Sequence, residues 1–191
     1  MHPISRWTLV GLALVFPIVV RAQEPTFHAG QWGAEFNIGT GANATLLHFT
    51  SPNAAWLMEF SGGASSIGSD VPDGSTTKTS FWNGSFRLGH RTYSSGTTVV
   101  RPFHSFGGLV SGSQTNNGST TEDTWAFGAF IDLGATWLVT PHLGLSGLGE
   151  LNGSYVNQTS RQSSNGTQQK LTSTGWSVGI GRLRVVASVY F

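Results

Sequence analysis

The chain has 191 residues, ten basic and nine acidic side chains, a net charge of +1 and no cysteine. The near-neutral charge and the lack of a basic cluster give no electrostatic case for nucleic-acid binding, and the lack of cysteine excludes a disulfide framework and any cysteine-based site or anchor. Charged residues make up only 10% of the chain, but twelve Phe and seven Trp argue against disorder.

The first 22 residues are typical of a secretory signal peptide. Arg6 supplies a positive charge, and an uncharged, mostly apolar run from Trp7 to Val20 follows it. A membrane anchor is the alternative, but this run is shorter than the ~20 residues of a spanning helix. We expect cleavage after Ala22, which leaves residues 23–191 as one domain.

Apolar and polar residues alternate along most of the remaining chain. From Trp125 to Trp137, every second residue is apolar, and a period of two predicts strands with one apolar face. No stretch after the signal peptide shows sustained helical periodicity or an apolar run of ~18 residues. Eight strands are predicted, over residues 31–39, 43–50, 54–63, 77–92, 97–111, 122–138, 142–157 and 171–191.

The predicted connections alternate in length. Three are tight, at residues 51–53, 93–96 and 139–141. Three are long and rich in Gly, Ser, Thr, Asn and Asp, at residues 64–76, 112–121 and 158–170. Short turns on one side and long polar loops on the other indicate an all-β fold, an eight-stranded antiparallel up-and-down transmembrane β-barrel. Only the loop near residues 39–43, on the same side of the barrel as the long loops, is short.

The tryptophans fall at the two ends of these strands. The length from Trp125 to Trp137, ~40 Å at ~3.3 Å per residue, projects to ~30 Å when the strand is tilted by ~40°. Amphipathic rings prefer the membrane interface, so two aromatic girdles are expected, although scattered core tryptophans are the alternative. Their members are Trp32, Trp56 and Trp137 on the short-turn side, and Trp82, Trp125 and Trp176 on the long-loop side.

Charged residues within the strands lie on the face opposite the apolar one. An eight-stranded barrel has an interior just filled by side chains, and charges there must pair. We expect a salt-bridged lumen rather than an ion path or catalytic carboxylates. The predicted charge network comprises Glu35, Glu59, Arg87, Arg101, Asp132, Glu150, Arg182 and Arg184.

The last strand holds two apolar series of opposite parity. One runs back from Phe191 through the odd positions, and the other runs forward from Trp176 through the even ones. One extra residue in a β-bulge restores both series. The sequence therefore predicts a bulge near Gly181-Arg182 with Trp176 and Phe191 both facing lipid. A regular strand with Trp176 inside the barrel is the alternative.

The chain ends in an alternating segment, residues 184–191, with apolar residues at Val189 and Phe191. This ending resembles the C-terminal assembly signal of outer-membrane proteins, although Val186 stands where glycine is common. Over its whole mature length the chain resembles the small OmpA/OmpX-like barrels in pattern. The resemblance implies a bacterial outer-membrane location, insertion by the barrel-assembly machinery, and contact with membrane lipid and lipopolysaccharide.

No catalytic, cofactor or metal site is predicted. Gly175-Trp176-Ser177-Val178-Gly179 matches a hydrolase motif, but that motif needs a strand-to-helix elbow. The residues around His104 do not match the motif of outer-membrane lipid-A acylhydrolases. The six histidines have no ligand spacing.

Two function classes remain. The first is a structural or surface-interaction barrel that meets an extracellular ligand through its loops. The second is a narrow solute pore or a lipid-handling barrel. A soluble lipocalin-like carrier is a weaker alternative, because the predicted lumen charges and the terminal Phe191 disfavour it.

Overall fold

The computed structural model describes residues 27–38, 42–70, 76–95, 99–164, 167–181 and 183–191. The predicted signal peptide and Arg182 lie outside the described residues. Every regular element in the described parts of the chain is a β-strand, and no helix there is long and apolar enough to cross a membrane. The strands are β1 Trp32–Asn37, β2 Ala42–Ser51, β3 Ala54–Asp70, β4 Thr76–Tyr93, β5 Val100–Asn116, β6 Thr120–Thr140, β7 Leu143–Ser164, β8 Thr167–Ile180 and β9 Arg184–Tyr190.

The strands close into an antiparallel ring. Each strand from β1 to β7 pairs with the next along the chain, and β1 closes the ring by pairing with β9. β7 pairs with both β8 and β9, so these two segments are parts of one eighth strand. The predicted all-β, eight-stranded antiparallel barrel is confirmed.

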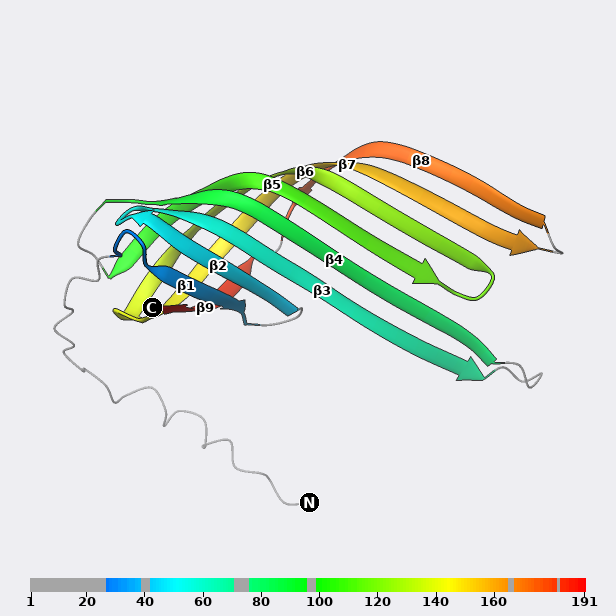
Figure 1. Ribbon diagram of the computed structural model, residues 1–191, viewed down its shortest axis with the longest axis horizontal. Helices are drawn as coiled ribbons and strands as arrows, with labels where there is room; N and C mark the ends of the chain where they lie inside the picture. The colour runs from blue at the N-terminus through cyan, green and yellow to red at the C-terminus, as the bar shows by residue number, and fades with distance from the viewer. Residues whose placement is uncertain (1–26, 39–41, 71–75, 96–98, 165–166, 182) are drawn as a thin grey trace, which may run out of the picture.

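The two ends of the barrel differ (Figure 1). The turns between β2 and β3 and between β6 and β7 define the turn end, on the left of the figure. The long β3–β4, β5–β6 and β7–β8 hairpins extend to the opposite side, the hairpin end. The ring is staggered. Starting at Phe36 and moving from each residue to its partner on the next strand, one arrives at Trp176 of β8. On the closing side of the ring, however, Phe36 pairs with Ala187 of β9, further along the same last strand. Such a stagger accompanies strands that tilt relative to the barrel axis.

The eighth strand contains the extra residue that its two apolar series require. Leu151 of β7 faces Ile180 of β8, whereas Leu148 faces Arg184 of β9. Two residues of β7 therefore lie opposite three residues of the last strand, at positions 181–183. Trp176 and Phe191 are both exposed on the outer face. The predicted one-residue bulge is confirmed, and the alternative of Trp176 inside the barrel is wrong.

The three segments predicted as long polar loops are wrong in extent. Most of their residues continue the strands: β3 pairs with β4 as far as Asp70–Thr76, β5 with β6 as far as Asn116–Thr121, and β7 with β8 as far as Ser164–Thr167. These strand ends carry small polar residues on both faces. Where both faces of a strand meet water, no hydrophobic alternation marks the strand in the sequence, although its backbone still pairs with the neighbouring strand.

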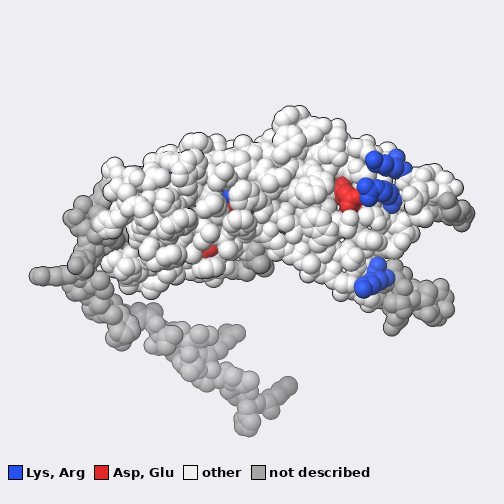
Figure 2. Space-filling model, viewed as in Figure 1, with Lys and Arg blue, Asp and Glu red and all other residues white. Residues whose placement is uncertain are grey.

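Apolar side chains cover the outside of the barrel and polar ones fill much of its interior. Phe127 and Leu133 of β6 are 61% and 65% exposed on the outer face, whereas Asp132 between them is 1% exposed on the inner face. In Figure 2, lysine and arginine gather at the hairpin end, and only small charged spots appear elsewhere on this face. This inside-out distribution suits a barrel surrounded by lipid.

An aromatic cluster fills the interior at the turn end. Phe27 packs against Phe49 with ring centroids 4.2 Å apart, and the rings of Tyr93 and Tyr190 each lie 4.9 Å from that of Phe27. All four side chains are buried. We call this group, Phe27, Phe49, Tyr93 and Tyr190, the aromatic plug.

Candidate functional site

Five of the predicted lumen charges meet in one place. This group, the lumen ion cluster, consists of Glu59, Arg87, Asp132, Glu150 and Arg184. Arg87 lies 2.8 Å from Glu59, 2.9 Å from Asp132 and 3.4 Å from Glu150. Arg184 reaches the same carboxylates from the other side of the barrel, at 2.8 Å from Glu59 and 3.4 Å from Glu150.

The strand register explains this arrangement. Glu59 of β3 is directly opposite Arg87 of β4, which is a favourable cross-strand pair. Asp132 of β6 is directly opposite Glu150 of β7, and like charges in that position repel. The two arginines lie between these carboxylates and offset the repulsion. Arg87 also stacks over the ring of Phe130, 3.7 Å from its centroid.

A second buried ion pair lies between the lumen ion cluster and the aromatic plug. Arg91 Nη1 is 2.6 Å from Glu35 Oε1, and its Nε donates to Ser105 Oγ at 3.1 Å. Its guanidinium also packs over the ring of Phe103 at 4.2 Å. Sequence reasoning missed Arg91, although it lies four residues after Arg87 and shares its face. That shared parity is the signal that could have found it.

Arg101 lies apart from the lumen ion cluster. Its guanidinium donates to Asn53 Oδ1 at 2.7 Å and to the carbonyl of Ser94 at 3.2 Å, both near the turn end. It also packs 5.5 Å from the ring of Phe27 in the aromatic plug. The prediction that grouped Arg101 with the cluster is corrected, because its position near the start of β5 brings it to the turn end. Arg182 lies outside the described residues.

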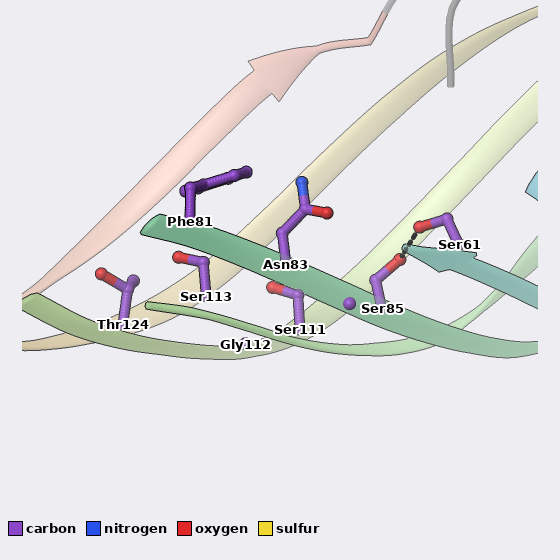
Figure 3. Close-up of a pocket in the computed structure, with 9 residues that line it drawn as sticks. Ser61, Phe81, Asn83, Ser85, Ser111, Gly112, Ser113 and Thr124 are labelled. Carbon is purple, nitrogen blue, oxygen red and sulfur yellow. Dashed lines mark hydrogen bonds between the residues drawn. The ribbon is translucent and has the colours of Figure 1, made fainter. Parts of the chain in front are cut away.

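Toward the hairpin end, the charged interior gives way to a hydroxyl-lined cavity of about 340 Å³ (Figure 3). The Ser61 and Ser85 hydroxyls are 2.6 Å apart there, one inward-facing residue pair above Glu59 and Arg87. No ionisable side chain is among the described residues that line the cavity. We call it the vestibule; its lining consists of Ser61, Phe81, Asn83, Gly84, Ser85, Ser111, Gly112, Ser113 and Thr124.

The wall of the barrel is interrupted beside the vestibule. Pairing between β2 and β3 ends at Ala42–Gly62, and the described part of β3 beyond it pairs with β4 alone. β8 pairs only with β7 within the described residues, and no close contact joins β8 to β1, β2 or β3 there. The β3–β4 and β7–β8 hairpins diverge accordingly in Figure 1. This gap, between Gly62–Asp70 and Thr167–Ile180, is the side opening.

The short first hairpin causes the side opening. β1 ends at Asn37 and β2 begins at Ala42, whereas the other hairpins continue much further. At the hairpin end, β1 and β2 therefore do not extend between β3 and β8. Two absent strands leave three strand spacings between β3 and β8, or ~14 Å.

All six tryptophans of the predicted girdles lie on the outer face and are at least 39% exposed. Trp32, Trp56 and Trp137 lie toward the turn end. Trp82 and Trp125 lie toward the hairpin end, with ring centroids 6.5 Å apart. Trp176, also toward the hairpin end, packs against Tyr155 of the neighbouring strand at 5.5 Å.

The residues of the predicted assembly signal also face outward. Val189 and Phe191 are 40% and 67% exposed. The backbone N–H of Phe191 donates to the carbonyl of Trp32 and its carbonyl accepts from the N–H of Trp32, both at 2.9 Å. These two bonds extend the closing seam between the first and last strands to the final residue.

The described residues contain neither a metal-binding group nor the strand-to-helix elbow of the hydrolase-like motif. No group of three or more His, Asp or Glu side chains there is arranged to hold a metal ion. Ser177 of the hydrolase-like motif lies in the middle of β8, opposite Ser154, and no strand-to-helix elbow exists at that point.

No known family model matches the sequence, and no curated protein resembles it at a significant level. Solved structures are similar. A major outer membrane protein from Thermus thermophilus has a TM-score of 0.56 at 14% identity, over 86% of this chain and 100% of that one. CarO of Acinetobacter baumannii has a TM-score of 0.40 at 14% identity, over 85% and 97% of the two chains. CarO2 of the same species has a TM-score of 0.39 at 13% identity, over 84% and 97%.

The ring closure and the likeness to the Thermus barrel define the class: this chain has the fold of an outer-membrane β-barrel protein.

Proposed function

We propose that the chain is an integral protein of a bacterial outer membrane, akin to the small OmpA/OmpX-like barrels, with a structural or surface-interaction role and no catalytic activity. On this proposal the signal peptide is removed after Ala22 and the hairpin end faces the cell exterior. The apolar outer face between two levels of tryptophan supports the membrane location.

The filled lumen is the observation that favours a structural or surface-interaction role over a pore. The lumen ion cluster, the Arg91–Glu35 pair and the aromatic plug follow one another along the interior. All their members are buried except Glu150 and Arg184, which are partly buried. An eight-stranded barrel has room for such side chains and for little else. Solutes would have to break several buried ion pairs to pass, which disfavours the alternative of a narrow pore.

The hairpin end is the part suited to outside contacts. Its strands extend past Trp82 and Trp125 and expose polar side chains on both faces. Lys78 and Lys170 are exposed there, and Arg161 forms a half-exposed pair with Asp123 at 2.7 Å. Cationic side chains at this level favour contact with the phosphate groups of lipopolysaccharide, which we propose as a partner of this surface.

We further propose that the barrel-assembly machinery reads the last strand. Val189 and Phe191 project outward on the strand that closes the ring, so a binding partner can reach them before closure.

Planar-bilayer recording combined with membrane fractionation tests the proposed function. We expect the protein in the outer-membrane fraction, with a gel mobility that changes on boiling, and no steady conductance after reconstitution. Steady ohmic channels from the folded protein would favour the pore. Recovery as a soluble periplasmic protein that needs no detergent would contradict the membrane location.

A further inference from the structure

The lower part of the side opening, from Gly62 to Ala64 and from Trp176 to Ile180, lies at the depth of the apolar band. Ala64 of β3 is opposite Trp82, so this edge of the opening reaches the hairpin-end tryptophans. On the other edge, Ile180 lies nearer the bulge than Trp176, and the four residue steps between them span ~10 Å along the membrane normal at a tilt of ~40°. Ile180 is 90% exposed, more than any other large apolar side chain of the described residues. Given the proposed orientation, the opening faces the outer leaflet.

Both edges of the opening present backbone groups without a neighbouring strand. Gly63 to Ser66 on β3 and Ser177 to Ile180 on β8 each have a partner strand on one side only, within the described parts of the chain. Unpaired N–H and C=O groups are very costly in hydrocarbon, and irregular backbone at this depth is tolerated only where it lines a polar or water-filled space. Acyl chains alone therefore cannot fill the opening. Its occupant has to donate and accept hydrogen bonds.

The surroundings change from apolar to polar across the lower edge of the opening. An outer hollow of about 510 Å³ lies at the tip of the first hairpin, and Ser61 lines both this hollow and the vestibule. The hollow combines apolar side chains with the amides of the hairpin tip; its lining consists of Phe36, Asn37, Asn43, Ala44, Phe60, Ser61 and Gly62. From outside to inside the lining thus passes from aromatic rings through amides to hydroxyls.

The vestibule selects the type of polar group. Hydroxyls from Ser61, Ser85 and Ser111 and the Asn83 amide point into it (Figure 3), and its described lining holds no ionisable side chain. The described members of the lumen ion cluster at its floor are two arginines and three carboxylates. This balance offers no surplus of positive charge to a phosphate. An uncharged group rich in hydroxyls matches the lining.

We propose that the side opening binds an outer-leaflet amphiphile with an uncharged, hydroxyl-rich headgroup, a glycolipid in chemical class. This inference rests on the membrane-barrel proposal above. The headgroup lies in the vestibule beside Ser61 and Ser85 and hydrogen-bonds the open strand edges. The acyl chains stay outside, against Phe36 and Phe60. A hairpin from another polypeptide would also pair with the edges, but it would make no use of the hollow or of the hydroxyl lining.

Native mass spectrometry of the refolded full-length barrel, in a detergent without a sugar headgroup, tests this proposal. Three lipids with identical acyl chains serve as probes: monoglucosyl diacylglycerol, diacylglycerol and phosphatidylglycerol. We expect one glucosyl lipid per barrel, retained about tenfold better than either other lipid, which is the preference that one or two extra hydrogen bonds give. Equal retention of diacylglycerol or phosphatidylglycerol, or no retention of the glucosyl lipid, overturns the proposal.

Variants of the vestibule provide the second arm. Ser85→Phe fills the vestibule and should abolish retention. Because this variant is not certain to fold, the double variant Ser61→Ala/Ser85→Ala removes only the paired hydroxyls and should weaken retention about tenfold. Ala129→Phe adds the same ring to the outer face of β6, a strand that borders neither edge of the side opening, and is the matched control, with unchanged retention. Wild-type retention in the double alanine variant contradicts the site.

Hydrogen exchange distinguishes a lipid from a strand. Among Gly63–Ser66 and Ser177–Ile180, the amides that point to the open edge should exchange fast without lipid and slowly with the glucosyl lipid. Slow exchange before lipid is added, in a protein that runs as an oligomer, means that a second chain fills the opening and the proposal is wrong. The boiling-dependent gel shift is scored separately, so failure of lipid binding is distinguishable from failure of the membrane-barrel proposal.

Discussion

Replacing Arg87 with alanine removes the central cation of the lumen ion cluster. Its guanidinium lies within 3.4 Å of Glu59, Asp132 and Glu150, and its side chain is only 5% exposed. Without it, Arg184 is the one cation left among the described members of the cluster to face three carboxylates, and the cation over the Phe130 ring is lost. Breaking a buried pair by removing one partner costs about 3–5 kcal/mol, because a charge is left buried without compensation.

A surface pair of the same length provides the matched control. Arg161 is 2.7 Å from Asp123, but its side chain is 52% exposed. Exposed pairs contribute about 0.2–1 kcal/mol, since water screens the charges and the side chains lose entropy. Arg161→Ala should therefore leave the free energy of unfolding nearly unchanged.

Reversible urea unfolding in lipid vesicles, followed by tryptophan fluorescence, measures both variants. The expected loss for Arg87→Ala exceeds that for Arg161→Ala by at least about 2 kcal/mol. Neutralising a carboxylate as well, in Arg87→Ala/Asp132→Asn, should recover part of the loss, because fewer like charges then face one another. Equal, small losses in the two single variants would refute the view that burial makes the cluster important for stability.

Three further predictions concern the wall of the barrel. A Cβ atom at Gly128 would collide with the carbonyl oxygen of Gly153, whereas one at Gly147 meets nothing within 4 Å. Gly128→Ala should therefore lower the free energy of unfolding by about 1–3 kcal/mol in the urea assay, and Gly147→Ala should change it little. Deletion of Phe191 should reduce the boiling-sensitive, membrane-inserted fraction, while Val185→Ala, also outward-facing but earlier in β9, should not; equal yields would contradict an assembly signal at the terminus. Deletion of Gly181 removes the extra residue of the eighth strand and should prevent folding, because one half of the strand then turns its apolar face inward. Deletion of Gly118 in the β5–β6 turn should be tolerated. A normal gel shift for both deletions would refute the register argument.

The sequence predicts best where lipid is on one side of a strand and the lumen on the other. Alternation from Trp125 to Trp137 marks β6 because apolar and polar faces differ there. The parity conflict between Trp176 and Phe191 reveals the bulge for the same reason. Beyond the apolar band this contrast disappears, since both faces meet water. The hairpin ends therefore look like loops in the sequence, although backbone pairing makes them strands.

The partners within the lumen were less accessible to sequence reasoning. Parity predicts that Glu59, Arg87 and Asp132 share the inner face, but which charges meet depends on the register of each hairpin and on the stagger of the whole ring. Arg91 could have been found, since it shares the inward parity of Arg87 on the same strand. The side opening also had a signal: the loop near residues 39–43 is short beside three long neighbours. Its meaning follows only once those neighbours are known to be strands.

The bulge, the end of the first hairpin and the lumen ion cluster coincide at one level of the barrel. A Cβ atom at Gly181 would lie 2.7 Å from Cβ of Glu150, so a glycine at the bulge leaves room for a carboxylate of the cluster. Below this level the ring is closed and filled; above it the wall is open and the lining is hydroxylic. Within the described parts of the chain, the open edges of β3 and β8 form no inter-strand hydrogen bonds, so the closed half of the barrel provides the ring closure on which the stability of the whole fold depends. Substitutions in the cluster should therefore affect the stability of the entire protein, while alanine substitutions in the vestibule should affect binding with little change in stability.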